Sequence, residues 1–318
     1  MKTTAAILAL LPALAAADPS WTWHQDGNRS IELRGATGPI VRFQLDCAPR
    51  DPHFDVFATP DGRNTVWVAP GDHVWHYGLW FSWKLINGVN FWETNQPTGL
   101  QDGRSEIADP QIESAPDAAT ATIRFRDLAH PTAGGPAVLE DAVVIRITRP
   151  RDGNGPQVQW TMKTTALEDV ELSRTPLPDE PDGKAYGGYG GFSWRGAKDF
   201  KDVRFTDSEG RQDMALHRQH ARWVELTGSL GGKPAGLSVL SHPLNPGHPA
   251  SWYLVATPNP QGPFWFVNPT LVQPKPIHLK KGESFTHSYQ ISVNDGNRPA
   301  DAARKEAEIF GTTTPLAK

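Results

Sequence analysis

The segment DHVWHYGLWFSWKLINGVNFWE, residues 72–93, carries the strongest local structural signal in the chain. Asn87-Gly88 separates two runs of aromatic and branched residues, and this dipeptide is typical of the type I′ turn of a two-residue β-hairpin. Side chains alternate between the two faces of a strand, so the first run divides into two sets. These sets are Leu79, Phe81, Trp83 and Leu85 against Trp80, Ser82 and Lys84. We therefore expect Trp83 in the core and Trp80 on the opposite face.

Short strands separated by turn dipeptides continue along the rest of the chain. Asp-Gly pairs occur at 26–27, 61–62, 102–103, 152–153 and 182–183. The expected strands are residues 40–46, 64–69, 120–127, 142–149, 158–164, 221–228, 235–241 and 285–293. Many short strands with regular Gly and Pro punctuation predict an all-β, antiparallel β-sandwich.

Only the C-terminal segment PADAARKEAEIF, residues 299–310, has the composition of a helix, and we expect one short helix there. No domain boundary is evident, so residues 18–318 are expected to form a single domain. The Pro/Gly-rich stretch RTPLPDEPDGKAYGGYGG, 174–191, is expected to be a long connection, and long connections in compact domains are often functional.

The first 17 residues have the features of a cleaved signal peptide. Lys2 precedes a short apolar run that ends at Ala15-Ala16-Ala17, a small-residue cleavage site. The run is too short to span a bilayer comfortably, and no later segment is long and apolar enough to do so. We therefore expect an exported protein, periplasmic or secreted, with no membrane span.

Composition narrows the classes of partner. With 31 basic against 35 acidic residues, the chain lacks the basic excess expected of a nucleic-acid-binding protein. Cys47 is the only cysteine, so no intrachain disulfide can form. The 12 tryptophans suit either a large β core or carbohydrate binding, since an indole combines an apolar face with a hydrogen-bond donor.

Three segments resemble a known family. DHVWHYGLWFSW with NGVNFWE (72–93), YGGYGGFSWR (186–195) and SHPLNPGHPASWY (241–253) are similar to signatures of the bacterial PmoA-like domain family, an uncharacterised group; the closing GESFTHSYQISVNDG (282–296) is similar as well. The likeness extends from about residue 60 to 297. Trp75, Tyr77 and Asn294 depart from the family pattern, which usually has His, Arg and His at these positions.

The resemblance implies a β-supersandwich similar to galactose-mutarotase-type domains and a role in carbohydrate chemistry. Fold analogy alone does not define the reaction. The family's historical label, methane oxygenase, does not fit this chain, because a membrane subunit of that kind would need several spanning helices.

His73 and His76, spaced i, i+3, point to opposite faces if the segment is extended and converge if it forms a turn. Metal ligation would require further ligands. Candidates for these are His242, His248, Glu93 and Glu209. A divalent metal is therefore one candidate cofactor, but the spacing matches no established metal signature. The alternative is that these histidines brace loops.

General acid–base chemistry on a sugar is the second interpretation. Histidine titrates near neutrality, and a nearby carboxylate can complete an acid/base pair. Glu93 follows the hairpin and is the preferred carboxylate; Glu209 is the other. Their alternatives are a solvated strand end and a turn residue. We assign His76, His242 and Glu93 as the candidate catalytic residues.

Ligand-binding candidates come from the same three segments. Arg195 ends a glycine-rich segment that allows close backbone approach, and it is the candidate substrate anchor, with a structural ion pair as the alternative. In SHPLNPGH three prolines restrict the chain, which favours rigid presentation of polar groups. The full set of candidate binding residues is His73, Trp80, Arg195, Asn245, His248 and Trp252, with Trp80 and Trp252 as stacking platforms.

Three functions follow from these residues. The first is a glycoside-cleaving hydrolase or lyase that uses His/Glu acid–base or metal-assisted chemistry. The second is an enzyme similar to mutarotases or epimerases, and the third is a non-catalytic glycan-binding module. All three require a carbohydrate ligand and assume that the segments near residues 75 and 245 share one cleft.

Overall fold

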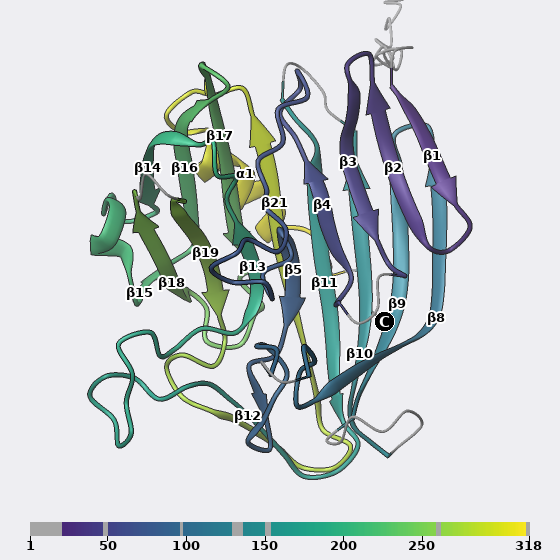
Figure 1. Cartoon of the computed structure of the whole chain (residues 1–318), viewed down its shortest axis with the longest axis vertical. Helices are drawn as coiled ribbons and strands as arrows, with labels where there is room; N and C mark the ends of the chain where they lie inside the picture. The colour runs from purple at the N-terminus through teal and green to yellow at the C-terminus, as the bar shows by residue number, and fades with distance from the viewer. Residues whose placement is uncertain are drawn as a thin grey trace, which may run out of the picture.

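Two large antiparallel sheets and one small sheet build the molecule (Figure 1). The computed structural model describes residues 21–46, 50–95, 98–128, 136–149, 154–258 and 262–315. The expected signal peptide (1–17) and Cys47 lie outside these residues. Together with the single short α-helix among them, the sheets confirm the all-β class with a C-terminal helix.

The nine-stranded sheet combines strands from both halves of the chain. Its strands, in spatial order, are β1 (Thr22–Asp26), β2 (Ser30–Gly35), β3 (Gly38–Gln44), β4 (His53–Phe57), β5 (Leu79–Ser82), β13 (Gly191–Arg195), β19 (Phe264–Thr270), β18 (Ala250–Thr257) and β15 (Gln219–Ala221). The junction of β5 with β13 joins the N-terminal strands to those from the second half of the chain.

The eight-stranded sheet lies against it. Its order is β14 (Lys201–Asp207), β16 (Trp223–Leu230), β17 (Lys233–Ser241), β21 (Ser284–Asn294), β11 (Gln157–Ala166), β10 (Ala137–Thr148), β9 (Ala118–Leu128) and β8 (Arg104–Ala115). The small sheet has the order β20 (Ile277–Leu279), β12 (Val170–Ser173), β6 (Leu85–Ile86) and β7 (Val89–Asn90). A 3₁₀ turn, η1 (Asp213–Leu216), and helix α1 (Ala302–Gly311) complete the elements.

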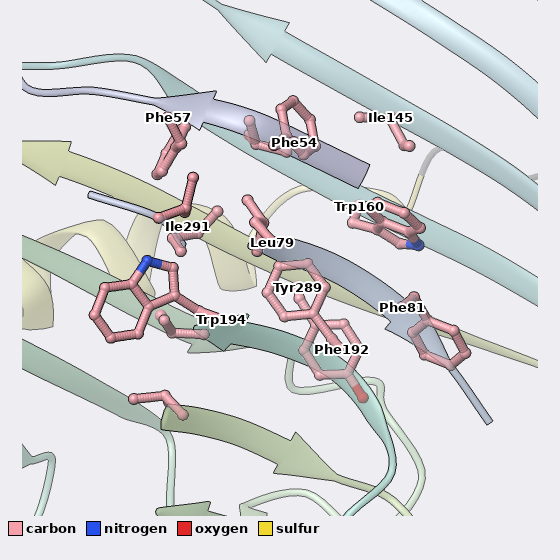
Figure 2. Close-up of a cluster of buried hydrophobic side chains, with 14 of the residues drawn as sticks. Phe54, Phe57, Leu79, Phe81, Ile145, Trp160, Phe192, Trp194, Tyr289 and Ile291 are labelled. Carbon is pink, nitrogen blue, oxygen red and sulfur yellow. The ribbon is translucent and has the colours of Figure 1, made fainter. Parts of the chain in front are cut away.

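The main core fills the space between the two large sheets. Figure 2 shows Phe54, Leu79 and Phe81 from the nine-stranded sheet beside Trp160 and Tyr289 from the eight-stranded one, all of them buried. Burying an aromatic side chain contributes about 2–3 kcal/mol from removal of apolar surface from water. A sandwich without a disulfide among its described residues can be stable on this basis.

The predicted hairpin is confirmed. Asn87 and Gly88 both have positive φ, 49° and 78°, as a type I′ turn requires, and Leu85 pairs with Asn90 while Ile86 pairs with Val89. The alternation before it is also confirmed, because Leu79, Phe81 and Trp83 enter the main core whereas Trp80 joins a separate buried cluster.

Two predicted boundaries differ from the structure. The segment 64–69 makes only isolated bridges and is not a strand of either sheet; the bridges join Asn64 to Ala58, Val66 to Gly196 and Val68 to Tyr77. The helix expected at 299–310 is α1, Ala302–Gly311. The β-branched residues of 64–69 predicted a strand. After Ala69 the chain turns, and the histidine segment folds back beside residues 64–69, so no strand pairs with them along their length.

Three buried aspartates lie within the sandwich near the end of β5. Asp127 on β9 accepts a hydrogen bond from Ser105, and Asp141 on β10 accepts hydrogen bonds from Thr164 and Trp83. Asp51 precedes β4 and lines the same small cavity, of about 20 Å³. Burial raises the pKa of all three carboxyls, to about 7 for Asp51 and about 6 for Asp127.

Candidate functional site

A cavity of about 470 Å³ lies on the face of the nine-stranded sheet that points away from the main core. Beside it lies a second buried aromatic cluster, called the floor cluster, made of Tyr77, Trp80, Trp92, Tyr253 and Phe266. Trp92, Tyr253 and Phe266 of this cluster line the cavity. Because β5 alternates, the same strand supplies Leu79 and Phe81 to the core and Trp80 to this outer cluster.

The cavity wall comes from four parts of the chain: the histidine segment, the end of the hairpin, the long glycine-rich connection, and strands β18 and β19. The lining residues are His73, Trp75, His76, Lys84, Asn90, Trp92, Glu93, Thr175, Tyr186, Tyr189, Tyr253, Phe264 and Phe266. Its volume falls within the range of small-molecule sites, about 300–1,000 Å³.

The histidine segment forms consecutive turns, which resolves the alternatives left by the i, i+3 spacing. The backbone N–H of His73 donates to Pro70, and that of His76 donates to His73. The two imidazoles therefore converge, with ring centroids 4.7 Å apart, and His73 also stacks on Phe264 at 4.7 Å. Both rings line the cavity.

Arg195 fixes this segment from beneath. Its guanidinium is fully buried and donates through Nη2 to both carboxylate oxygens of Asp72, at 2.8 and 3.1 Å. It also stacks on Phe264, with the guanidinium carbon 4.0 Å from the ring centroid. Arg195 does not line the cavity, so the structure supports the ion-pair interpretation and does not support the expected substrate anchor.

His76 is electrostatically suited to act as a neutral base. Its side chain is only 4% exposed, and its Nδ1 has no hydrogen-bond partner among the described residues. Burial, followed by the nearby His73 and Arg195, lowers the pKa of His76 well below its usual value. The imidazole is therefore uncharged at neutral pH.

A second polar group, Lys84–Glu93–Tyr189, occupies the wall formed by the hairpin and the long connection. The ammonium of Lys84 and the hydroxyl of Tyr189 each donate to one carboxylate oxygen of Glu93. Lys84 also donates to Asn90 at 3.3 Å and lies 5.5 Å from the centroid of the Tyr189 ring. All four residues line the cavity.

Burial controls the ionisation of this group. It lowers the pKa of Lys84, against the opposing effect of Glu93, and together with the Glu93 charge it raises the pKa of Tyr189. Tyr189 therefore stays protonated as a hydrogen-bond donor. Glu93 is the only carboxylate among the described residues that line the cavity.

The second histidine motif does not reach this cavity, which corrects the expectation of a shared cleft. His73 stacks on Phe264, and Phe264 pairs with Thr257 at the far end of β18. The motif precedes Ala250 at the near end, seven residues away, or roughly 23 Å at about 3.3 Å per residue.

The residues of that motif brace the C-terminal segment. His242 shares a hydrogen bond with the Thr313 carbonyl at 3.0 Å and packs against Phe310 of α1. Asn245 pairs with the backbone of Ser288, donating at 2.8 Å and accepting at 2.7 Å. His242, Asn245 and His248 therefore are not placed with His76 and Glu93.

Neither expected stacking platform is exposed. Trp80 and Trp252 are each 1% exposed; Trp80 lies in the floor cluster, and the Trp252 indole N–H donates to Ala221. The aromatic rings that do line the cavity include Trp75 and Tyr186, and Tyr186 is 56% exposed.

The sequence pattern singled out neither Lys84 nor Tyr189 as a site residue. Lys84 shares its strand face with Trp80. A lysine on the same face as a large aromatic residue could have indicated that Lys84 belongs to the site. Its pairing with Tyr189 links residues more than a hundred positions apart, a separation that local patterns do not reveal. Glu209, the alternative carboxylate, bonds with its neighbour Ser208 and lies outside the cavity.

Within the part of the chain that the structure describes, no three His, Cys, Asp or Glu side chains are grouped closely enough to hold a metal ion. No helix among the described residues is long and apolar enough to cross a membrane.

The protein is an antiparallel β-sandwich whose outer sheet face carries a cavity lined by aromatic and polar side chains. The chain belongs to a family of unknown function, DUF6807, whose pattern matches residues 30–308. The matched family has no other description, so the PmoA-like label stays a resemblance. No protein of curated function matches the sequence.

Three solved structures align with most of this chain at low identity and low TM-score. A galactose mutarotase-like protein from Lactobacillus casei ATCC 334 aligns over 86% of this chain and all of its own, with 9% identity and a TM-score of 0.40. A galactose mutarotase related enzyme from Lactobacillus acidophilus aligns over 86% of this chain and 97% of its own, with 9% identity and a TM-score of 0.34.

The galactosidase domain of an alpha-galactosidase-sucrose kinase aligns over 84% of this chain but only 41% of its own, with 10% identity and a TM-score of 0.42. At these scores none of the three assigns an activity to this chain.

Proposed function

We propose that this protein is a carbohydrate-active enzyme that cleaves a glycoside by general acid–base chemistry in the cavity of His76 and Glu93. The observation that carries the proposal is the shared cavity itself. A neutral, buried imidazole and a hydrogen-bonded Lys–Glu–Tyr group face one space whose remaining lining is mostly aromatic.

The lining supports a sugar as ligand. Aromatic faces pack against the C–H bonds of a pyranose, while Asn90, Glu93 and the histidines offer donors and acceptors for hydroxyl groups. The Nε1 atom of Trp92 is buried in this wall without a hydrogen-bond partner among the described residues. Buried polar groups of this kind are usually satisfied by a bound molecule or water.

The residues divide into two chemical roles. His76, uncharged at neutral pH, accepts a proton from the sugar carbon next to the one that bears the departing oxygen. The electron pair of that C–H bond forms the new double bond as the C–O bond breaks. The Lys84–Glu93–Tyr189 group, on the wall formed by the hairpin and the long connection, holds the ligand hydroxyls, and the Lys84 ammonium supplies a proton to the departing oxygen. Burial makes that ammonium a stronger acid than a solvated lysine.

This arrangement favours elimination over hydrolysis. Glycoside hydrolysis usually relies on two carboxyl groups that flank the scissile bond, about 5–10 Å apart. Glu93 has no such partner among the described residues that line the cavity. A lyase-type reaction needs one base and one proton donor, and the cavity supplies both.

The test is incubation of the purified protein with a panel of glycosides, followed by proton NMR. The expected result is cleavage with formation of an unsaturated sugar. The variant His76→Phe preserves the ring packing against Trp92 and Phe266 and should reduce the rate at least about 100-fold. His242→Phe is the matched control, since His242 is another buried imidazole packed against an aromatic ring.

The other outcomes are informative. Interconversion of anomers without cleavage would replace this proposal with a mutarotase-type activity. Binding without any product would indicate a glycan-binding module.

We also propose that residues 1–17 direct export to the periplasm or beyond and are then removed. The N-terminal sequence of the protein recovered from outside the cytoplasm would test this.

A further inference from the structure

Tyr186 stands at the mouth of the cavity in a way that its own packing does not explain. The side chain is 56% exposed, yet it lines the same space as His76 and Glu93. Single exposed aromatic residues are common on protein surfaces and carry no meaning alone. What distinguishes Tyr186 is the construction of the segment that holds it.

The connection around Tyr186 is tied to the preceding strand end. Lys184 N–H donates to the Pro176 carbonyl at 3.1 Å, and Gly188 N–H donates to the Thr175 carbonyl at 3.1 Å. Gly187 passes so close that a Cβ there would lie 1.9 Å from the Pro176 oxygen. Only glycine allows this approach, and the approach fixes the backbone on one side of Tyr186.

Arg218 holds the same segment from the other direction. Its Nη2 donates to the carbonyls of Ala185 and Gly187, at 3.0 and 2.8 Å, which are the two residues that flank Tyr186. Arg218 adopts a φ of 61° and its own N–H donates to Trp252 of β18 at 2.7 Å. A non-glycine residue in the left-handed region is uncommon and needs surrounding contacts to hold it.

Two independent anchors therefore present one exposed ring over the cavity mouth. Such an arrangement reduces the conformational entropy that a flexible ring would lose on binding. The polar groups lie further in, at Glu93 and His76, whereas the mouth offers an aromatic face. A ligand bound by this layout has a polar unit inside and a unit with an apolar face outside.

We infer that Tyr186 is the platform of an outer subsite, and that the ligand is a glycoside of at least two units whose second unit stacks on this ring. Arg218 is the positioning residue for the platform. This inference rests on the proposed function and deepens it, because it names a glycoside, and not a free monosaccharide, as the ligand class.

The test compares two probes that share one sugar and resist cleavage: a methyl and a phenyl 1-thioglycoside. Affinities are measured by titration calorimetry with the full-length protein, for each sugar of a panel of common hexoses and pentoses. We expect a preference of about tenfold for the phenyl compound, the scale of one aromatic stacking contact. Tyr186→Ala should abolish that preference and leave the methyl affinity unchanged, whereas Tyr186→Phe should retain it.

Arg218 has its own readout. Arg218→Met should lower the phenyl preference about threefold or more without changing the methyl affinity, and Arg218→Lys, which keeps a donor near the two carbonyls, should restore part of it. Equal affinity of the two probes for the unmodified protein would overturn the inference and leave the proposed function intact. An equal loss of both affinities in Tyr186→Ala would do the same. Failure of every sugar to bind would overturn both.

Discussion

Replacing Asp51 by asparagine should change how the stability of the protein depends on pH. The Asp51 carboxyl is buried beside Asp127, and burial, reinforced by that neighbouring charge, raises its pKa from 3.8 to about 7. The folded protein then keeps the Asp51 proton up to about pH 7, whereas the unfolded chain releases it near pH 4. The stabilising contribution is therefore fully present below pH 4 and is lost as the pH rises through 7.

The magnitude follows from the difference between the two pKa values. About three pH units separate 3.8 from about 7, and each unit corresponds to about 1.4 kcal/mol, so the loss amounts to about 4 kcal/mol. Asparagine cannot titrate, so the Asp51→Asn protein does not lose this stability between pH 4 and pH 8. The free energy of unfolding of Asp51→Asn, relative to the unmodified protein, should therefore rise by about 4 kcal/mol between pH 4 and pH 8.

The assay is urea unfolding followed by tryptophan fluorescence at pH 4, 5, 6, 7 and 8. His287 is buried and its pKa is lowered to about 3, so it reduces the free energy of unfolding as the pH falls from 6.5 to 3. Both proteins contain His287, so this effect cancels when they are compared. Asp182→Asn is the control, since Asp182 is exposed and its positive φ of 58° also suits asparagine. Parallel pH profiles for Asp51→Asn and the unmodified protein would refute the reasoning.

Three further predictions follow from the site and its surroundings. Lys84→Met should remove the proton donor and lower turnover at least about 100-fold while the protein stays folded by circular dichroism; unchanged turnover would exclude the role of the Lys84–Glu93 pair. Asn245→Ala removes both side-chain hydrogen bonds to the backbone of Ser288, whose carbonyl keeps only the His242 N–H as a donor, and should cost about 1–3 kcal/mol in urea unfolding without altering sugar affinity, so weaker binding would contradict the separation of the two motifs. Arg195→Met should cost about 3 kcal/mol and weaken sugar binding through the displaced histidine turn; an unchanged melting temperature would argue against the anchoring role.

The sequence predicted those features that depend on short-range rules. Side-chain alternation along residues 79–83 placed Trp83 in the core and Trp80 opposite, and Asn87-Gly88 defined the hairpin turn. His73 and Glu93 were selected because they flank this hairpin, and the structure places both on the cavity. The long connection was singled out by its composition, and it supplies Tyr189.

The features that the sequence did not predict depend on strand order and burial. Prolines around His242 and Asn245 indicated rigid presentation of polar groups, and the groups are rigid, but the β18–β19 pairing places them against α1 and not against His76. Arg195 was expected to meet a ligand, yet it is fully buried under Phe264. Periodicity gives the face on which a side chain lies; it does not give the partner across the fold.

The place of β21 in the eight-stranded sheet has a consequence for biosynthesis. This strand, Ser284–Asn294, follows every other described strand in chain order, yet it lies between β17 and β11 and pairs with both. Until it leaves the ribosome, the edges of β17 and β11 that face it stay unpaired, because among the described strands only β21 joins these two. The chain cannot complete this sheet before residue 294 has been made, and any truncation before residue 284 divides the sheet at its centre.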